Sequence, residues 1–303
     1  QKFFGVSELS NKNFSVGVIG LGNMGVPLAA ALAKAGNLDA VWNRTRSRGE
    51  RVAQDLGVFL AENPQQLAAR CNVVLLSLAR DADVLAIVAE MSPALRADTI
   101  VIDTSTTGID TARAAAASLA ARASHFLDAP VSGGVAGARA GSLVAMVGGD
   151  AQVFARARPI FAAFSARAEW LGPAGSGQAA KAVNQLMVAG INQAVSEALA
   201  FGEALALPMT QLVDLLGGGA AANWFLAERG HAMLRSEFAA GFKIALHQKD
   251  LELCKAMAAA HGAQLPMVEM TLVHYKRLIA EGYGDSDTSA LIQQKRRLFT
   301  EAK

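Results

Sequence analysis

Two hydrophobic patterns follow one another along the chain. Up to about residue 175, short apolar runs rich in β-branched residues alternate with alanine-rich stretches of helical character. Such runs predict buried strands, which we expect at residues 14–20, 38–42, 72–79, 99–105, 125–130, 143–149 and 168–172. Because strands and helices alternate, the pattern predicts an α/β fold with a doubly wound Rossmann-type sheet.

The pattern changes after Gly175. Residues 177–207 read as one long helix that Pro208 ends, and the segments beyond it show apolar residues at three- and four-residue spacing. We therefore expect a Rossmann-type sheet domain at 14–175, joined by a long helix to an all-helical domain at 176–303. The alanine-rich surface of the helical domain predicts a homodimer or homotetramer formed through it.

Composition narrows the class of protein. A chain of 303 residues with 52 % hydrophobic residues is long and apolar enough for two ordered domains. The net charge is +2 and the basic residues form no dense block, which argues against nucleic acid as a partner. The apolar runs are shorter than the ~18 residues of a membrane span. Residues 1–13 contain no signal-peptide core and read as a loose leader, so a cytoplasmic protein is expected.

The cysteines and histidines give no metal-ligand pattern. Cys71 and Cys254 lie far apart without CxxC spacing, and the five histidines are scattered. Two buried, reduced thiols and no metal are therefore predicted.

The sequence GVIGLGNMGVPLA, residues 17–29, carries G-x-G-x-x-G between an expected strand and an expected helix that begins near Met24. In that context the first glycine permits a tight turn, the second lets main chain approach a pyrophosphate, and the third lets helix and strand pack closely. The alternative is a structural turn without a ligand. The predicted cofactor site comprises Gly20, Leu21, Gly22, Asn23, Met24 and Gly25.

The end of the second expected strand reads VWNRT. NAD-binding sites usually place an acid there for the ribose 2′-hydroxyl, whereas this chain has Asn43 followed by Arg44 and Thr45. A guanidinium can hold a 2′-phosphate with two hydrogen bonds, so NADP(H) is the predicted cofactor, with NAD possible. Alternatively, Arg44 is an ordinary surface residue and Thr45 caps a helix.

Lys181 is the main candidate for catalysis. It lies in GSGQAAKAVNQL, residues 175–186, among alanines and with few other charges. Desolvation lowers the pKa of an ammonium and eases proton donation, which suits a general acid for carbonyl reduction. The alternative is a lysine whose stem packs while its head reaches water. Asn184 and Gln185 follow at i+3 and i+4 on the same helix face.

Four segments in order resemble the β-hydroxyacid dehydrogenase family, and the resemblance spans residues 15 to 298. They are GVIGLGNMGVPLA, FLDAPVSGGVAGARAGSL (126–143), GSGQAAKAVNQ and GFKIALHQKDLEL (241–253). KAVNQ, LHQKDL and GAQLPM are most similar to members that reduce 2-hydroxy-3-oxopropionate to glycerate. Members acting on succinic semialdehyde, glyoxylate or 3-hydroxyisobutyrate share most of these residues, so these remain alternatives.

The resemblance implies roles for further residues. Lys181 would be the general acid. The main-chain donors around Ser132, Gly133 and Gly134 would hold a small carboxylate, although a turn without a ligand is the alternative. Substrate would also meet Asn184, Gln185, Phe242 and Asp250, and for each of the two amides the alternative is a hydrogen bond between helices. Many members have two asparagines where this chain has Asn184 and Gln185, which leaves open which amide reaches the substrate.

Two residues are expected at the cofactor. The resemblance places Thr106 near the nicotinamide and Lys249 at the mouth shared by cofactor and substrate. Their alternatives are a helix N-cap for Thr106 and a solvated helix face for Lys249 and Asp250.

A different class of function is a dinucleotide-binding scaffold without turnover, and the intact lysine with its amides argues against it. Imine reductases share the architecture but usually lack this lysine.

Overall fold

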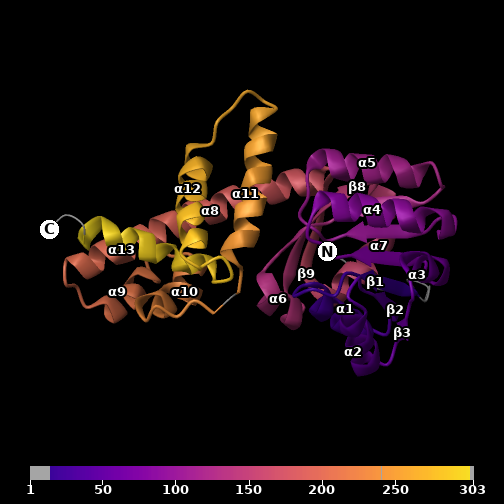
Figure 1. The fold of residues 1–303 in the computed structure, drawn as a ribbon, viewed down its shortest axis with the longest axis horizontal. Coiled ribbons are helices and arrows are strands. Elements are labelled where there is room, and N and C mark those ends of the chain that lie inside the picture. The colour runs from indigo at the N-terminus through magenta and orange to yellow at the C-terminus, as the bar shows by residue number, and fades with distance from the viewer. Residues whose placement is uncertain (1–13, 240, 301–303) are drawn as a thin grey trace, which may run out of the picture.

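The computed structural model describes residues 14–239 and 241–300, so the predicted leader at 1–13 lies outside the described residues. A sheet domain and a helical domain lie side by side, and one long helix runs from the first into the second (Figure 1). This arrangement confirms the predicted fold class, a Rossmann-type sheet followed by helices.

Nine strands form one sheet in the described part of the chain. They are β1 (Val16–Ile19), β2 (Leu38–Trp42), β3 (Phe59–Leu60), β4 (Val73–Leu76), β5 (Ile100–Asp103), β6 (His125–Asp128), β7 (Val131–Ser132), β8 (Leu143–Gly149) and β9 (Ser165–Gly172). The order begins β3-β2-β1-β4-β5-β6, all parallel. The chain direction reverses at β8, which is antiparallel to β6 and β7 and parallel to β9. The strand order reverses between β1 and β4, where open α/β sheets bind ligands beyond the carboxyl ends of their strands.

Helices cover both faces of the sheet, as its buried strands require. They are α1 (Gly25–Lys34), α2 (Arg46–Leu56), α3 (Pro64–Arg70), α4 (Asp81–Met91), the 3₁₀ helix η1 (Ser92–Ala94), α5 (Ile109–Ala120), α6 (Gly134–Ala140) and α7 (Ala151–Phe164).

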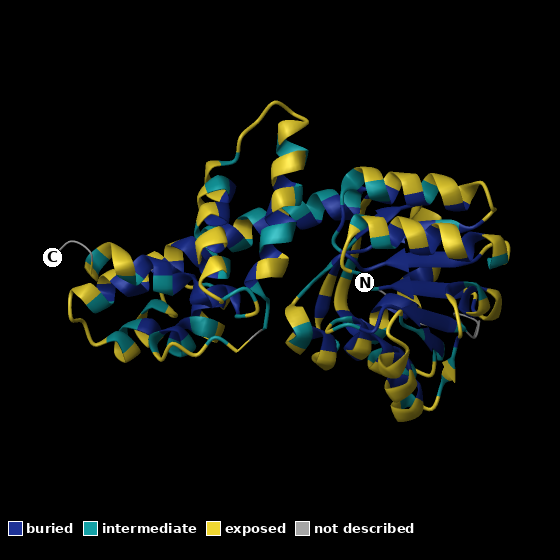
Figure 2. Cartoon of the chain, in the orientation of Figure 1, coloured by how far each residue is buried: buried dark blue, intermediate teal, exposed yellow. Residues whose placement is uncertain are grey.

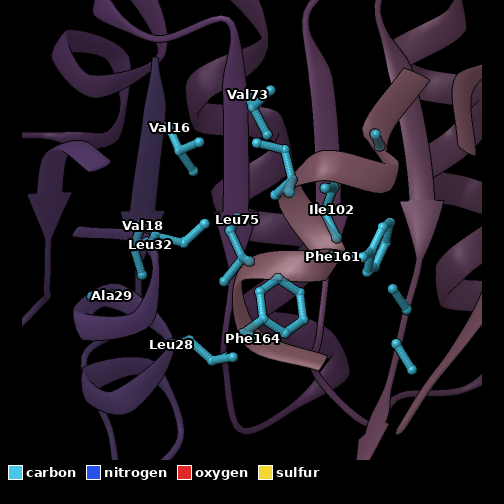
Figure 3. Close-up of a cluster of buried hydrophobic side chains, with 14 of the residues drawn as sticks. Val16, Val18, Leu28, Ala29, Leu32, Val73, Leu75, Ile102, Phe161 and Phe164 are labelled. Carbon is cyan, nitrogen blue, oxygen red and sulfur yellow. The ribbon is translucent and has the colours of Figure 1, made fainter. Parts of the chain in front are cut away.

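Successive residues of each strand point to opposite faces, so one strand supplies two cores. On one face Val18, Leu75 and Ile102 pack with Phe161 and Phe164 of α7 (Figure 3). On the other face, a second cluster packs strand residues against α3, α4 and α5, with Leu76, Leu67, Val84 and Leu119 among its members. Burial on both faces explains why these strands read as unbroken apolar runs.

The helical domain surrounds the far part of α8. Its elements are α8 (Ser176–Ala204), α9 (Met209–Leu216), α10 (Trp224–Leu234), α11 (Ile244–Ala259), α12 (Pro266–Ala280), the 3₁₀ helix η2 (Thr288–Leu291) and α13 (Ile292–Thr300). Leu251, Leu272 and Tyr275 are fully or almost fully buried in a core against α8. None of the helices in the described ranges is long and apolar enough to span a bilayer.

The buried face of α8 is unusually polar. Figure 2 shows that much of this helix is covered by the elements around it. Five of its buried polar residues follow one another at spacings of three, four, seven and four positions: Gln178, Lys181, Gln185, Asn192 and Ser196. Buried polar groups must find hydrogen-bond partners, and the partners of the first three define the candidate site.

Candidate active site

The glycine motif forms a tight turn between β1 and α1. Gly20 has a φ of 93°, and a Cβ there would overlap the main chain of Ser77 at the end of β4. A Cβ at Gly25 would overlap the carbonyl of Gly20, whereas one at Gly22 would meet nothing within 4 Å. Gly22 therefore leaves open space beside the first turn of α1, whose N–H groups favour an anion. This geometry fits a dinucleotide pyrophosphate.

Asn43 joins the glycine turn to the segment after β2. Its Oδ1 accepts from the Leu21 N–H at 2.9 Å, and its Nδ2 donates to the Thr45 carbonyl at 3.0 Å. Thr45 is the N-cap residue of α2 but makes no side-chain capping bond. The Arg44 side chain is 80 % exposed and lies 3.5 Å from Asp83 Oδ1. The Arg44 guanidinium therefore lies at the surface, beside an acidic side chain. Within the glycine turn, Leu21 is buried, Met24 half-buried and Asn23 exposed.

Lys181 is buried where α8 meets the sheet. Only 7 % of the residue is exposed, and Nζ donates to the Val131 carbonyl of β7 at 2.9 Å. Burial lowers the pKa of Lys181 from 10.5 to about 8; the negative charge of Asp250 opposes the shift, and the positive charge of Lys249 adds to it. An ammonium with a pKa near neutrality can both donate a proton and stabilise a developing alkoxide.

The loop after β7 follows directly on the lysine's partner. Ser132 is half-buried, and Gly133 and Gly134 have φ angles of 124° and 62°, a conformation that favours glycine. A Cβ built on Gly134 would lie 3.9 Å from the carbonyl oxygen of Gly241, so this loop faces the segment that enters α11. The first residue of α6, Gly134, thus follows three residues after Val131, whose carbonyl Lys181 binds.

The two amides after Lys181 differ in their surroundings. Gln185 is 2 % exposed; its Nε2 donates to Asp250 Oδ2 at 2.7 Å, and its Oε1 accepts from Asn184 Nδ2 at 2.8 Å. Asn184 is half-buried, and its Oδ1 accepts no hydrogen bond from the described residues. Both ends of the Gln185 amide are therefore engaged within the protein, and Asn184 keeps a free acceptor.

Lys249 connects the two domains. Its Nζ donates to the Thr106 carbonyl at 2.6 Å and lies 2.9 Å from Asp250 Oδ1. The lysine is thus held by two partners and does not lie on a solvated helix face. Thr106 lies after the end of β5, and α5 is capped by Gly108, so Thr106 is not its N-cap.

Phe242 lies at the entrance to α11 and is half-buried. Its N–H donates to Asp287 Oδ2 at 2.9 Å, and its ring centroid lies 5.2 Å from that of His247. His247 is fully buried, with Nδ1 2.9 Å from the Tyr275 hydroxyl and Nε2 3.3 Å from the Gln185 carbonyl. Burial lowers the pKa of His247 to about 4, so it is a neutral support between α8, α11 and α12.

Two buried residues that the sequence analysis did not single out also belong to this region. Asp128 ends β6 and accepts the Gly175 and Gln178 N–H groups, while the Gln178 side chain binds the main chain on both sides of Thr106. A usable signal was present, because Gln178 lies three residues before Lys181 in an otherwise apolar segment.

The described residues contain no group of three or more His, Cys, Asp or Glu side chains suited to a metal ion. Cys71 and Cys254 are free and buried, as predicted, and burial raises the pKa of each to about 11.

Two family profiles match the chain. Residues 15–172 match the NAD binding domain of 6-phosphogluconate dehydrogenase, and residues 175–294 match the domain described as NAD-binding of NADP-dependent 3-hydroxyisobutyrate dehydrogenase.

Individual relatives match over nearly the whole chain. The 2-hydroxy-3-oxopropionate reductase of Escherichia coli K12 is 35 % identical over 282 residues, covering 92 % of this chain and 96 % of that protein. The NAD-dependent L-serine dehydrogenase of Pseudomonas aeruginosa is 32 % identical over 290 residues, covering 91 % and 96 %. Among solved structures, Mycobacterium tuberculosis 3-hydroxyisobutyrate dehydrogenase with L-serine has a TM-score of 0.85 at 32 % identity, covering 93 % and 99 %.

Proposed function

Because the chain belongs to the β-hydroxyacid dehydrogenase family and is therefore an NAD(P)-dependent oxidoreductase, we propose that it reduces 2-hydroxy-3-oxopropionate to glycerate with NADPH. Lys181 is the general acid in this proposal. The observation that carries it is the buried ammonium of Lys181, which is tied to Val131 at the start of the Ser132–Gly134 loop.

The chemistry divides between cofactor and protein. Bound NADPH would supply the hydride from its nicotinamide. The aldehyde oxygen gains negative charge as its carbon accepts hydride, and Lys181 gives that oxygen a proton. One N–H of the ammonium points to the Val131 carbonyl, which leaves two for the substrate oxygen. The aldehyde thereby becomes an alcohol, and the neutral lysine regains its proton from solvent.

The substrate contacts follow from the groups that are free. Main-chain N–H groups and the hydroxyl at Ser132, Gly133 and Gly134 suit the carboxylate. Asn184 Oδ1 suits the 2-hydroxyl as an acceptor. Gln185 acts indirectly by holding Asp250, and Phe242 and Asp250 border the site from the helical domain.

The cofactor contacts are assigned by the same reasoning. The residues Gly20, Leu21, Gly22, Asn23, Met24 and Gly25 would cradle the pyrophosphate, and Thr106 and Lys249 would lie at the nicotinamide end. Asn43 brings no charge to the ribose, and Arg44 and Thr45 follow it on an exposed edge. NADPH is preferred in this proposal because Arg44 can pair with the 2′-phosphate.

We also propose a homodimer or homotetramer formed through the helical domain. Val183 and Met187 lie one turn apart on α8 and are 62 % and 61 % exposed, and Leu215 of α9 is 74 % exposed. A groove of about 570 Å³ between α8, α12 and α13 shares no residue with the proposed catalytic site. Light scattering on the purified protein would measure the number of subunits.

A substrate panel tests the proposed activity. Reduction of 2-hydroxy-3-oxopropionate, succinic semialdehyde and glyoxylate, and oxidation of 3-hydroxyisobutyrate and L-serine, would each be measured with both cofactors. We expect the highest kcat/KM for 2-hydroxy-3-oxopropionate with NADPH. A much higher value for another member of the panel would replace the substrate while leaving the lysine chemistry in place.

A further inference from the structure

Gln178 ties the helix that carries Lys181 to the loop that carries Thr106. Its side chain is almost fully buried, at 1 % exposure. Oε1 accepts from the Thr107 N–H at 3.0 Å, and Nε2 donates to the Ser105 carbonyl at 2.9 Å. One amide therefore binds the main chain on both sides of Thr106, as a neighbouring strand would.

The main chain of Gln178 is fixed as well. Asp128 Oδ2 accepts from the Gln178 N–H at 2.9 Å, and Asp128 Oδ1 accepts from the Gly175 N–H at 2.8 Å. Asp128 is fully buried at the end of β6, next to Asp103 of β5 in the parallel register. The first turn of α8 is thus anchored to two adjacent strands, by its main chain to β6 and by one side chain to the loop after β5.

This anchor lies one helical turn from the proposed general acid. Lys181 follows Gln178 at i+3 and shares its helix face. The carbonyl of Thr106, between the two residues that Gln178 binds, accepts from Lys249 Nζ at 2.6 Å. Gln178 therefore connects the start of the catalytic helix, the Thr106 loop and, through that loop, α11.

We propose that Gln178 is a positioning residue, which sets the place of Lys181 relative to Thr106 and hence relative to the carbonyl that is reduced. This inference rests on the proposed function of Lys181 and Thr106. A displacement of about 1 Å between reacting groups is sufficient to lower a rate by about 100-fold. The two Gln178 hydrogen bonds can therefore control kcat.

A matched pair of variants separates positioning from ordinary stabilisation. Gln178→Met keeps side-chain length and removes both amide hydrogen bonds. Gln193→Met makes the same change further along α8, where a 3 % exposed glutamine donates to Thr271 and contacts His274 within the helical domain. Both variants remove buried amide contacts from one helix, but only the first touches the Thr106 loop.

The kinetic readout is a split between kcat and KM. Gln178→Met should lower kcat by about 10- to 100-fold, raise the primary isotope effect with 4-deuterated NADPH, and leave the KM for NADPH within about threefold. Gln193→Met should keep kcat within about threefold of wild type, because distant sites act independently. Equal kcat values in the two variants would overturn the inference.

A second readout needs neither cofactor nor turnover. Amide hydrogen exchange of the unliganded protein should show loss of protection at Thr107 in Gln178→Met and no change there in Gln193→Met. Unchanged protection at Thr107 in Gln178→Met would also overturn the inference. Wild type could turn over no substrate of the panel while Thr107 still loses protection in Gln178→Met. The proposed function would then fail, but the structural role of Gln178 would stand.

Gln178→Glu provides a rescue, and it carries the test if Gln178→Met does not fold. A protonated carboxyl has one acceptor and one donor, like the amide, whereas the carboxylate has only acceptors and faces the Ser105 carbonyl. The ratio of kcat in this variant to kcat in wild type should therefore rise as the pH falls. A ratio that does not change with pH would contradict the positioning role of Gln178.

Discussion

The ammonium nitrogen of Lys181 lies 2.9 Å from the main-chain oxygen of Val131. Val131 belongs to β7, and the residues that follow it turn directly into the loop Ser132–Gly134. The group proposed to give the proton and the donors proposed to hold the carboxylate are therefore fixed to one another through a single short strand.

The pH profile of reduction should report Lys181. Since the pKa of Lys181 is lowered to about 8, the ammonium is present below that pH and is lost above it. The value of kcat/KM for aldehyde reduction should be level at lower pH and fall about tenfold per pH unit above about 8. For oxidation of the alcohol, kcat/KM should instead rise with pH up to about 8, because the neutral amine must accept the proton. A reduction profile that is flat up to pH 10 would exclude the lysine as the acid.

The same lysine should affect stability with a defined sign. Its pKa is about 8 in the folded state and 10.5 when exposed, so the unfolded chain binds more protons between these values. The free energy of unfolding should therefore rise with pH across this window, by up to about 3 kcal/mol from this group. Denaturant titrations of wild type and Lys181→Met at pH 7.5 and 10 would isolate the effect, and a constant difference between the two proteins would contradict it.

Truncation of Asn184 should mainly lower activity, whereas truncation of Gln185 should mainly lower stability. Asn184→Ala removes the Oδ1 acceptor, which takes no hydrogen bond from the described residues, so kcat/KM should fall about tenfold. It also removes the Asn184 donor to Gln185 Oε1, so Tm should fall, but by less than in Gln185→Ala. Gln185→Ala deprives the 5 % exposed Asp250 of its amide donor and should cost about 1–3 kcal/mol of stability. Kinetics and thermal unfolding of both variants would measure the two effects. A larger loss of kcat/KM in Gln185→Ala than in Asn184→Ala would assign the substrate contact to Gln185.

Cofactor preference should depend on the segment after β2. Asn43→Asp places a carboxylate where the 2′-phosphate is proposed to lie and should shift the NADPH-to-NADH ratio of kcat/KM toward NADH by at least about tenfold. Arg44→Ala should shift it in the same direction. A wild-type enzyme that clearly favours NADH would refute the NADPH assignment directly.

Local patterns in the sequence were sufficient to predict the larger elements. Strands buried on both faces give apolar runs, and the long helix α8 was expected at 177–207 and is observed at Ser176–Ala204. The two-residue strands β3 and β7 were missed because two residues carry no periodicity. The reversal at β8 was also missed, since parallel and antiparallel pairing depend on partners distant in sequence.

Only those parts of the candidate site could be predicted whose residues lie close together in one sequence segment. The glycine turn and Lys181 were evident from spacing and from charge among alanines. The contacts of Gln185 with Asp250 and of Lys249 with Thr106 join residues 65 and 143 positions apart, and no local pattern encodes them. Gln178 could have been noticed from its place three residues before Lys181, but its partners in the loop after β5 are not encoded in any local pattern.

The most direct test of the proposed chemistry is the turnover of Lys181→Ala in aldehyde reduction, measured together with NADPH affinity. Removing a general acid should lower kcat by about 100- to 10,000-fold. NADPH should bind with a Kd within about threefold of wild type, because the proposed pyrophosphate site lies on the glycine turn and not on α8. Undiminished kcat in this variant would show that the buried ammonium does not supply the proton.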